Sequence, residues 1–360
     1  MRISTAKPLL VWVLAWGTAA ACAVPLAAET RAAPSRPGAT THFTGAENVS
    51  AAAFGARFGL KAETSETGKI LVLKNAWHTV QLESDTRECT VDGQRVFLGE
   101  AVRTRRGELQ LNRIDAERLL APILSPGTGE ECVPGLKIIA LDPGHGGKDA
   151  GKSNERYGIN EKTLTLDTAL RLKKLLEAAG HQVVLTRPDD RQLAPDKVTD
   201  LQCRAEIANR AHADLFISLH YNSVAVRPET VTGVEVFTMT PQSQFSTGDN
   251  GRDDGQVKLA NPGNASDHWN TLLGYFLHRQ MLRDLQVSDR GLKRARWAVL
   301  RLVECPAILI ESGYLSNDAE ARKIATPAYR QKIAEAIADG IAAYANALEG
   351  VRRQRAAVKR

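Results

Sequence analysis

The stretch Lys137-Ile-Ile-Ala-Leu-Asp-Pro-Gly-His-Gly-Gly147 decides the fold of this 360-residue chain. Its apolar run, Lys137–Leu141, ends in a turn rich in Pro and Gly, which is typical of a buried strand that stops abruptly. Similar runs alternate with helical patterns further along the chain. They are Gln182–Leu185, Leu215–Leu219, Val234–Met239, Ala298–Val303 and Ala307–Ile310. This alternation predicts an α/β fold with an open, mostly parallel six-stranded sheet and helices on both faces.

The segments between these runs carry apolar residues at helical spacing. Asn160–Gly180 places its apolar side chains on one face, with Asn160 as the expected N-cap and Gly180 as the stop. Asp200–Ala213 and His268–Leu285 are further predicted helices. An apolar stripe from Ile333 to Leu348 predicts a last helix.

The chain before the sheet divides into several predicted parts. Two cations precede the apolar run Leu9–Ala21 and small residues follow it, so residues 1–28 are typical of an export signal rather than a transmembrane helix. We expect no stable membrane span after its removal and a periplasmic or extracellular location. The other predicted parts are a flexible lead-in (29–47), a small α+β domain (48–124), a linker (125–136), the main domain (137–350) and a basic tail (351–360).

Charge and cysteine content exclude some classes of site. The chain has 47 Lys+Arg against 41 Asp+Glu, a net charge of +6 that is scattered rather than clustered. This argues against a nucleic-acid groove but suits weak attraction to an anionic polymer. Four cysteines follow the signal, and none has the spacing of a thiolate metal site. Their pairing stays open between disulfides and free thiols; they are Cys89, Cys132, Cys203 and Cys305.

Polar residues at strand ends predict a metal site. His145 follows the first strand, His220 ends the strand Leu215–Leu219, and Glu161 opens the helix between them. Active sites in open α/β sheets lie beyond the carboxyl ends of the strands, so we expect these side chains to meet. Two imidazoles and one carboxylate form a full catalytic zinc set, with the fourth position left for water.

Glu311 follows the predicted strand Ala307–Ile310. Its position at the same edge of the sheet predicts a catalytic carboxylate beside the metal. A carboxylate there can take a proton from a zinc-bound water and pass it to a leaving nitrogen. Spacing alone leaves structural roles open. Glu161 could serve only as a first-turn acid, and Glu311 could pair with an arginine such as Arg301 or Arg204.

Four linked segments resemble the zinc-dependent N-acetylmuramoyl-L-alanine amidases (the amidase_3 family). They occur in the family's order and span about residues 137–347; they are Ile139–Gly151, Asn160–Lys162, Ser218–Ser223 and Leu309–Asn317. The resemblance implies one zinc ion held by His145, Glu161 and His220, with Glu311 as the catalytic glutamate. It also implies cleavage, outside the cytoplasmic membrane, of the bond between N-acetylmuramic acid and L-alanine of a peptidoglycan stem peptide.

We expect three residues near these motifs to contact substrate: Asn222, Tyr221 and Arg204. The resemblance also implies packing and orienting roles for Arg204 and Asn209. Tyr221 stands where relatives carry a small residue, so we expect a narrower rim or a stacked sugar. The insert Pro241–Asp267 corresponds to a segment that, in some relatives, blocks the zinc until an activator protein removes it. Here it is rich in Gly, Asp, Asn and Ser, which disfavours a helix and predicts a loop bordering the cleft.

The small domain resembles the N-terminal module of copper amine oxidase-like proteins. The resemblance rests on the hairpin Asp92-Gly-Gln94 and the following Val96-Phe-Leu98. His78 is its only histidine, which does not support a copper site, and a role as a wall anchor or spacer is expected from its context. Two rival functions stay open for the chain: a non-catalytic wall-binding protein and a zinc peptidase acting on the stem peptide.

Overall fold

The computed structural model describes residues 47–129, 131–247 and 255–358, and all of them belong to one compact unit. The predicted signal peptide (1–28) and, apart from Glu47, the predicted lead-in (29–47) lie outside the described residues. The helices are α1 (Ala51–Ala56), α2 (Arg113–Asp115), α3 (Ala121–Leu124), α4 (Glu161–Ala178), α5 (Lys197–Arg210), α6 (Asp267–Leu285), α7 (Ala298–Arg301), α8 (Asp318–Ile324) and α9 (Pro327–Val358). The strands up to the main domain are β1 (Asn48–Ser50), β2 (Lys61–Thr64), β3 (Ile70–Lys74), β4 (Thr79–Glu83), β5 (Glu88–Val91), β6 (Gln94–Phe97), β7 (Arg103–Arg105) and β8 (Glu108–Asn112). Those of the main domain are β9 (Ile138–Pro143), β10 (Ser153–Asn154), β11 (Ile159–Asn160), β12 (Gln182–Leu185), β13 (Leu215–Asn222), β14 (Val234–Met239), β15 (Asp289–Ala295) and β16 (Ala307–Tyr314).

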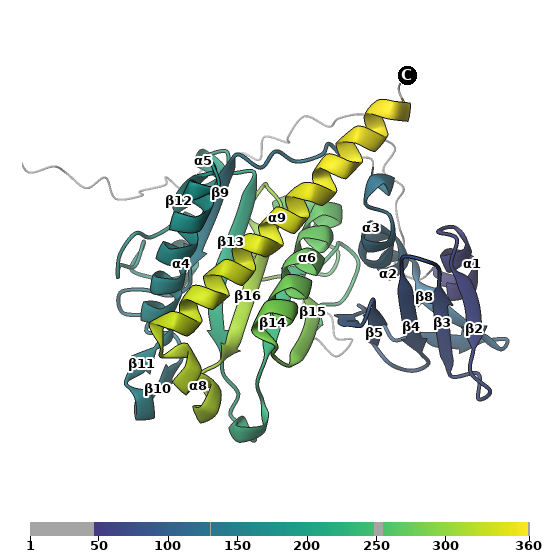
Figure 1. The fold of residues 1–360 in the computed structure, drawn as a ribbon, viewed down its shortest axis with the longest axis horizontal. Coiled ribbons are helices and arrows are strands. Elements are labelled where there is room, and N and C mark those ends of the chain that lie inside the picture. The colour runs from purple at the N-terminus through teal and green to yellow at the C-terminus, as the bar shows by residue number, and fades with distance from the viewer. Residues whose placement is uncertain (1–46, 130, 248–254, 359–360) are drawn as a thin grey trace, which may run out of the picture. The chain divides into compact units, whose positions relative to one another are not determined.

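The main sheet has eleven strands, in the order β12-β9-β13-β16-β14-β15-β6-β5-β4-β3-β2 (Figure 1). Strands β12, β9, β13 and β16 are parallel, whereas β14 is antiparallel to β16 and the strands from β6 to β2 are antiparallel to one another. The α/β class is confirmed, but the predicted six-stranded, mostly parallel sheet is wrong. The sheet is mixed and longer because β15 pairs with β6 at Leu292 and Val96, which joins it to the strands of the small domain.

One predicted strand is a helix, and one strand was not predicted. Ala298–Val303 forms α7 and its C-terminal turn instead of a strand, with Val299 and Leu300 buried. A short apolar run fits a buried helix as well as a strand, so periodicity alone does not separate them. The sixth strand that the main domain contributes to the large sheet is β15 (Asp289–Ala295), in which four of the seven residues are charged.

Two apolar clusters cover opposite faces of the sheet. Alternate strand residues such as Ile217 and Ile310 pack with residues of α4, α6 and α9, which lie over one face (Figure 1). The intervening residues, such as Phe216 and Leu309, pack with α5 and α7 on the other face. Successive side chains of a strand point to opposite faces, so His220 and Glu311 share the α5 and α7 face. The carboxyl ends of β9, β13 and β16 therefore present their polar residues beside α5 and α7.

The expected caps and turns explain where several elements begin. Asn160 caps α4 as predicted, because its side chain accepts from Thr163 N at 3.2 Å. The predicted hairpin at Asp92-Gly93 joins β5 to β6, and both residues have positive φ, as a two-residue hairpin turn requires.

The pairing of the cysteines was left open by the sequence. In the structure, Cys89 and Cys305 are free thiols.

The last helix is longer than expected. Part of the predicted basic tail (351–360) is helical, since α9 continues to Val358. The reason is that its cations have partners in the segment predicted as a linker: Arg352 donates to Pro134 O, and Arg355 donates to Glu131 O at 2.7 Å. Within the described part of the chain, no helix combines the length and apolar character needed to cross a membrane.

A buried ion pair joins the small domain to the main sheet. Arg294 of β15 donates from Nη1 to Asp115 Oδ1 at 3.1 Å, and the two side chains are 2% and 0% exposed. Asp115 also accepts from Gly99 N at 2.8 Å. Burial lowers the pKa of Arg294, so the partner carboxylate is needed to keep this guanidinium charged without a large cost.

We expect Asp115→Ala to lower the free energy of unfolding by about 3–5 kcal/mol, because it leaves Arg294 buried without its carboxylate. Chemical denaturation measures the change. Glu206→Ala removes the exposed partner of Arg210 and is the matched control, with a change of at most about 0.5 kcal/mol. Equal effects of the two variants would contradict a stabilising role for the junction pair.

Candidate metal centre

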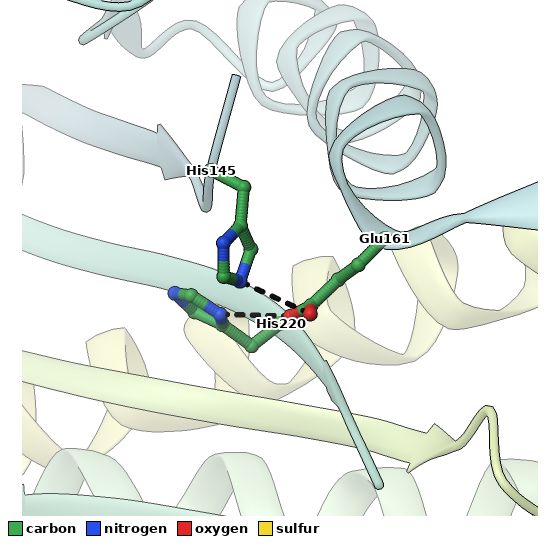
Figure 2. Close-up of side chains that lie close together, drawn as sticks. All are labelled: His145, Glu161 and His220. Carbon is green, nitrogen blue, oxygen red and sulfur yellow. Dashed lines mark hydrogen bonds and ion pairs between the residues drawn. The ribbon is translucent and has the colours of Figure 1, made fainter. Parts of the chain in front are cut away.

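Three predicted side chains meet at the carboxyl edge of the sheet. His145 follows β9, Glu161 is the first residue of α4 and His220 lies in β13. Glu161 bridges the imidazoles: its Oε2 lies 3.0 Å from His145 Nε2 and its Oε1 lies 2.9 Å from His220 Nδ1 (Figure 2). The two rings are 5.0 Å apart between centroids and nearly perpendicular. The structure therefore brings together residues that are up to 75 positions apart in sequence.

Close packing around these residues explains the glycines of the motif. A Cβ at Gly144 would lie 2.3 Å from His220 Cε1, and one at Gly151 would lie 2.6 Å from Glu161 Oε2. His145 itself has φ of +63°, an unusual backbone conformation for a residue other than glycine. The turn is thus fixed by the need to bring the His145 ring against Glu161.

Hydrogen bonds hold Glu161 in its ionised form. Burial acts to raise the pKa of this carboxyl, but hydrogen bonds from His145 and His220 outweigh it and lower the pKa well below the ordinary value. The backbone N–H groups of Lys152 and Tyr221 donate to it at 2.9 and 3.1 Å. An anionic Glu161 is the form that binds a cation.

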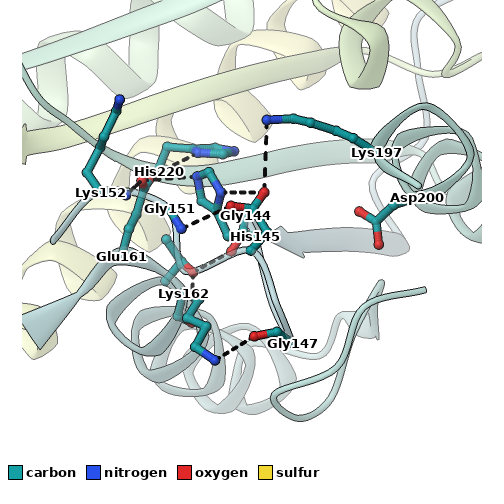
Figure 3. Close-up of polar contacts among 12 residues, drawn as sticks. Gly144, His145, Gly147, Gly151, Lys152, Glu161, Lys162, Lys197, Asp200 and His220 are labelled. Carbon is teal, nitrogen blue, oxygen red and sulfur yellow. Dashed lines mark hydrogen bonds and ion pairs between the residues drawn. The ribbon is translucent and has the colours of Figure 1, made fainter. Parts of the chain in front are cut away.

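Asp149 holds the other side of the His145 ring. Its Oδ2 lies 3.0 Å from His145 Nδ1, and Lys197 Nζ lies 3.9 Å from the same oxygen. Figure 3 shows His145 and Lys197 among the polar residues around Glu161. A carboxylate at the second ring nitrogen is the usual way in which a metal-binding histidine is oriented. The spacing of four residues after His145 is the sequence signal that identifies Asp149, although sequence reasoning assigned it no role.

The donor set fits a divalent metal ion. One ligand atom each from His145, Glu161 and His220 can be chosen so that all lie within 4.8 Å of one another. Two imidazole nitrogens and one carboxylate oxygen are the ligand types of catalytic zinc sites, which keep a fourth position open. No other such group of three occurs among the described residues.

Glu311 of β16 lies beside His220 of the neighbouring strand β13. The two residues are register partners in β13 and β16, and Glu311 pairs on its other side with Glu235 of β14. Glu311 is 9% exposed, and its Oε2 has no hydrogen-bond partner in the described structure. Burial, followed by the negative charges of Glu161 and Glu235, raises its pKa well above the ordinary value. The carboxylate form of Glu311 is therefore a stronger proton acceptor than an ordinary exposed glutamate.

A cavity of about 330 Å³ opens at these residues. Its lining includes the three predicted ligands, Glu311 and Asn222, and also residues that the sequence did not single out. The latter include Lys152, Lys197, Trp297 and Val299. Trp297 was missed because it lies in the run expected to lead into a strand. No described residue of the insert Pro241–Asp267 lines this cavity, which differs from the expected loop bordering the cleft.

Two of the predicted substrate-binding residues, Tyr221 and Arg204, line the cavity, but their side chains are almost fully buried. Tyr221 is 1% exposed and its OH lies 2.8 Å from Thr168 Oγ1, so it packs under α4 and does not form the expected rim or sugar stack. Its backbone direction explains this, because it points to the face opposite that of His220. Asn222 faces the cavity, and its Nδ2 donates to Glu235.

Arg204 orients the site and has few donors left for substrate. It is 2% exposed and donates to Asp142 Oδ1 at 2.9 Å and to Asp200 Oδ2 at 2.7 Å. It also donates to His145 O at 2.6 Å, which anchors the turn. Asp142 accepts in addition from the hydroxyls of Thr186 and Ser218, at 2.6 and 2.7 Å.

Comparisons with known proteins agree on one family. A family model described as N-acetylmuramoyl-L-alanine amidase matches residues 139–343. The germination-specific N-acetylmuramoyl-L-alanine amidase of Bacillus subtilis is 31% identical over 217 residues, which are 58% of this chain and 79% of that protein. The amidase AmiC of Escherichia coli O6:H1 is 31% identical over 265 residues, which are 65% of this chain and 59% of that protein. The solved amidase AmiC2 of Nostoc punctiforme is 33% identical and covers 59% of this chain and 99% of its own, with a TM-score of 0.46.

The buried Asp142 gives the site a defined acid sensitivity. Burial opposes ionisation, but Arg204 and the two hydroxyls outweigh it and lower the pKa of Asp142. A depressed folded pKa stabilises the protein above the unfolded value, about pH 4, and this contribution is lost as the pH falls through the folded pKa. We expect the wild type to lose stability below about pH 4 more steeply than Asp142→Asn.

Urea unfolding as a function of pH measures this difference. The exposed Asp339→Asn is the matched control, and its stability should follow the wild type across the acid range. Parallel curves for Asp142→Asn and the wild type would contradict the assignment of Asp142 as an ionised anchor.

Proposed function

This chain belongs to the N-acetylmuramoyl-L-alanine amidase family, and from that membership we propose that it is an exported, zinc-dependent hydrolase of peptidoglycan. Its bond is the amide between the lactyl group of N-acetylmuramic acid and L-alanine of the stem peptide. The single observation that carries the proposal is Glu311, which lines the same cavity as His145, Glu161 and His220. It is a buried carboxyl whose Oε2 has no hydrogen-bond partner among the described residues.

We assign His145, Glu161 and His220 as the ligands of one zinc ion. When bound, zinc supplies Lewis-acid polarisation of the carbonyl and an acidified water. Asp149 holds the His145 ring from its second nitrogen, and Arg204 holds the backbone of the same residue. The ligands are therefore oriented before the metal binds, which reduces the cost of organising the site.

Glu311 is the proton carrier of the reaction. Its carboxylate takes a proton from the attacking water, whose oxygen bonds to the lactyl carbonyl carbon. It then gives that proton to the nitrogen of L-alanine as the carbon–nitrogen bond breaks. The products are a free lactyl carboxyl and an amino-terminal L-alanine. The lack of a partner at Oε2 suits this role, because a carboxyl oxygen with fixed donors is less free to accept and release a proton.

The proposed cellular setting rests on the sequence and on the family. The signal-like residues 1–28 support action in the periplasm or outside the cell, in wall remodelling or separation of daughter cells. We propose peptidoglycan as the partner, with an activator protein as a second one, and a wall-binding or spacing role for residues 48–124. Nucleic acid is not a proposed partner.

Digestion of purified peptidoglycan tests the bond specificity. We expect free stem peptides that begin with L-alanine, together with glycan chains that retain intact sugars, as measured by mass analysis of the products. Shortened peptides still attached to sugar would replace this proposal with a stem-peptide peptidase. Absence of any cleavage by zinc-loaded enzyme would favour a non-catalytic wall-binding protein.

Two variants separate metal binding from proton transfer. Glu311→Gln keeps the shape of the side chain but removes its proton acceptor, so it should retain zinc and lose about 10²–10⁴-fold in turnover. His145→Ala removes a ligand and should lose zinc, as measured by metal analysis after dialysis. Full activity of Glu311→Gln, or stoichiometric zinc in His145→Ala, would overturn the corresponding role.

A further inference from the structure

A row of side chains crosses the sheet next to the cavity and reaches the small domain. Leu309 of β16, which lines the cavity, is the register partner of Phe237 in β14, and Phe237 is the partner of Lys293 in β15. The next strand, β6, is joined through Leu292 and Val96, so Phe97 follows at the same level. Register partners share a face, so this row lies on the face that carries His220 and Glu311.

This face is partly open beyond α7. The alternate residues Val236, Leu292 and Val96 point the other way and are buried, the first two against the side that α6 covers. Phe237, Lys293 and Phe97 are only half-buried, in contrast. Trp297, at the start of α7, is 38% exposed and lines the cavity as well. The row is therefore an accessible surface that is continuous with the candidate metal centre.

Aromatic rings dominate this surface. The rings of Trp297 and Phe237 are 4.4 Å apart between centroids. Lys293 Nζ lies 5.7 Å from the centroid of Phe237 and 5.4 Å from that of Phe97, and so connects the two rings. Gly291 makes room for Phe97, because a Cβ there would lie 2.4 Å from the ring. We call Trp297, Phe237, Lys293 and Phe97 the aromatic row.

The charges beside the aromatic row are paired. Lys293 is ion-paired with Glu235, and Arg95, which lies over the Phe97 ring, is paired with Glu88 at 2.7 Å. A surface of this kind has little net charge to attract the carboxylates of a stem peptide. It offers flat apolar faces together with polar groups, which suits the C–H faces and hydroxyls of uncharged sugar rings.

We propose that the aromatic row is a glycan subsite, which binds the sugar chain of peptidoglycan beside the amide to be cut. Neighbouring strands lie about 4.8 Å apart, so the three steps from Leu309 to Phe97 span roughly 14 Å, a length that suits a chain of sugars. The identity of the glycan rests on the proposed function. Phe97 brings the small domain into substrate binding, a role that nothing in the catalytic motifs requires.

Binding of chitohexaose, an uncharged N-acetylglucosamine oligomer without peptide, tests this subsite in the full-length protein. Isothermal titration should show binding by the wild type, weakened about three- to tenfold in Phe97→Ala and in Trp297→Ala. Phe97→Tyr keeps a flat ring and should restore it. Trp77→Ala is the matched control, because Trp77 is an 83% exposed aromatic residue of the same domain outside the aromatic row.

Several outcomes would overturn the subsite. The first is that the wild type does not bind chitohexaose. The second is that Phe97→Ala and Trp297→Ala both bind it with wild-type affinity. Thermal unfolding checks that each variant is folded. Weaker binding of free L-Ala-γ-D-Glu-diaminopimelate in Phe97→Ala, with chitohexaose unaffected, would reassign the row to the stem peptide. Sugar binding without cleavage of peptidoglycan would retain the subsite and overturn the proposed amidase function, so the two failures are distinguishable.

Discussion

The buried carboxylate of Glu161 is the constraint to which the rest of the site conforms. Four donors converge on it: two imidazoles and two backbone N–H groups. Those donors come from separate segments of the chain. The ends of β9 and β13 and the start of α4 must therefore lie close to one another. The glycines of the turn and the unusual backbone of His145 follow from that requirement, as does the buried pair of Asp142 and Arg204 that supports the turn. A negative charge placed so deeply is stabilised by a compensating cation, and the proposed metal ion would be that cation.

The sequence predicted the site better than it predicted the sheet. The candidate ligands follow or precede strand ends with distinctive glycine and histidine spacing, and His145, Glu161 and His220 do lie together in the structure. Glu311 was also placed near them, because the strand Ala307–Ile310 has an unambiguous apolar pattern. Their chemical roles remain a proposal, since position alone does not identify a ligand or a base.

Predictions failed where tertiary packing decides the outcome. β15 has a charged sequence, and its pairing depends on neighbours far away in the chain, so no local pattern marked it as a strand. Ala298–Val303 has the composition of a buried element but packs as a short helix. The substrate-binding roles of Tyr221 and Arg204 stay predictions. Both residues line the cavity, but the alternation of β13 turns the Tyr221 side chain under α4, and two carboxylates bind Arg204.

The junction between β15 and β6 has a consequence for solubility. A sheet that ended at β15 would present a row of unpaired backbone groups, and such an exposed edge invites association with other chains. The small domain covers that edge with its own strands and ends the sheet at β2, whose four residues are all exposed and begin with a lysine. Short, polar outer strands are poor templates for further pairing. Residues 48–124 thus keep the edge of the main sheet from pairing with other copies of the chain.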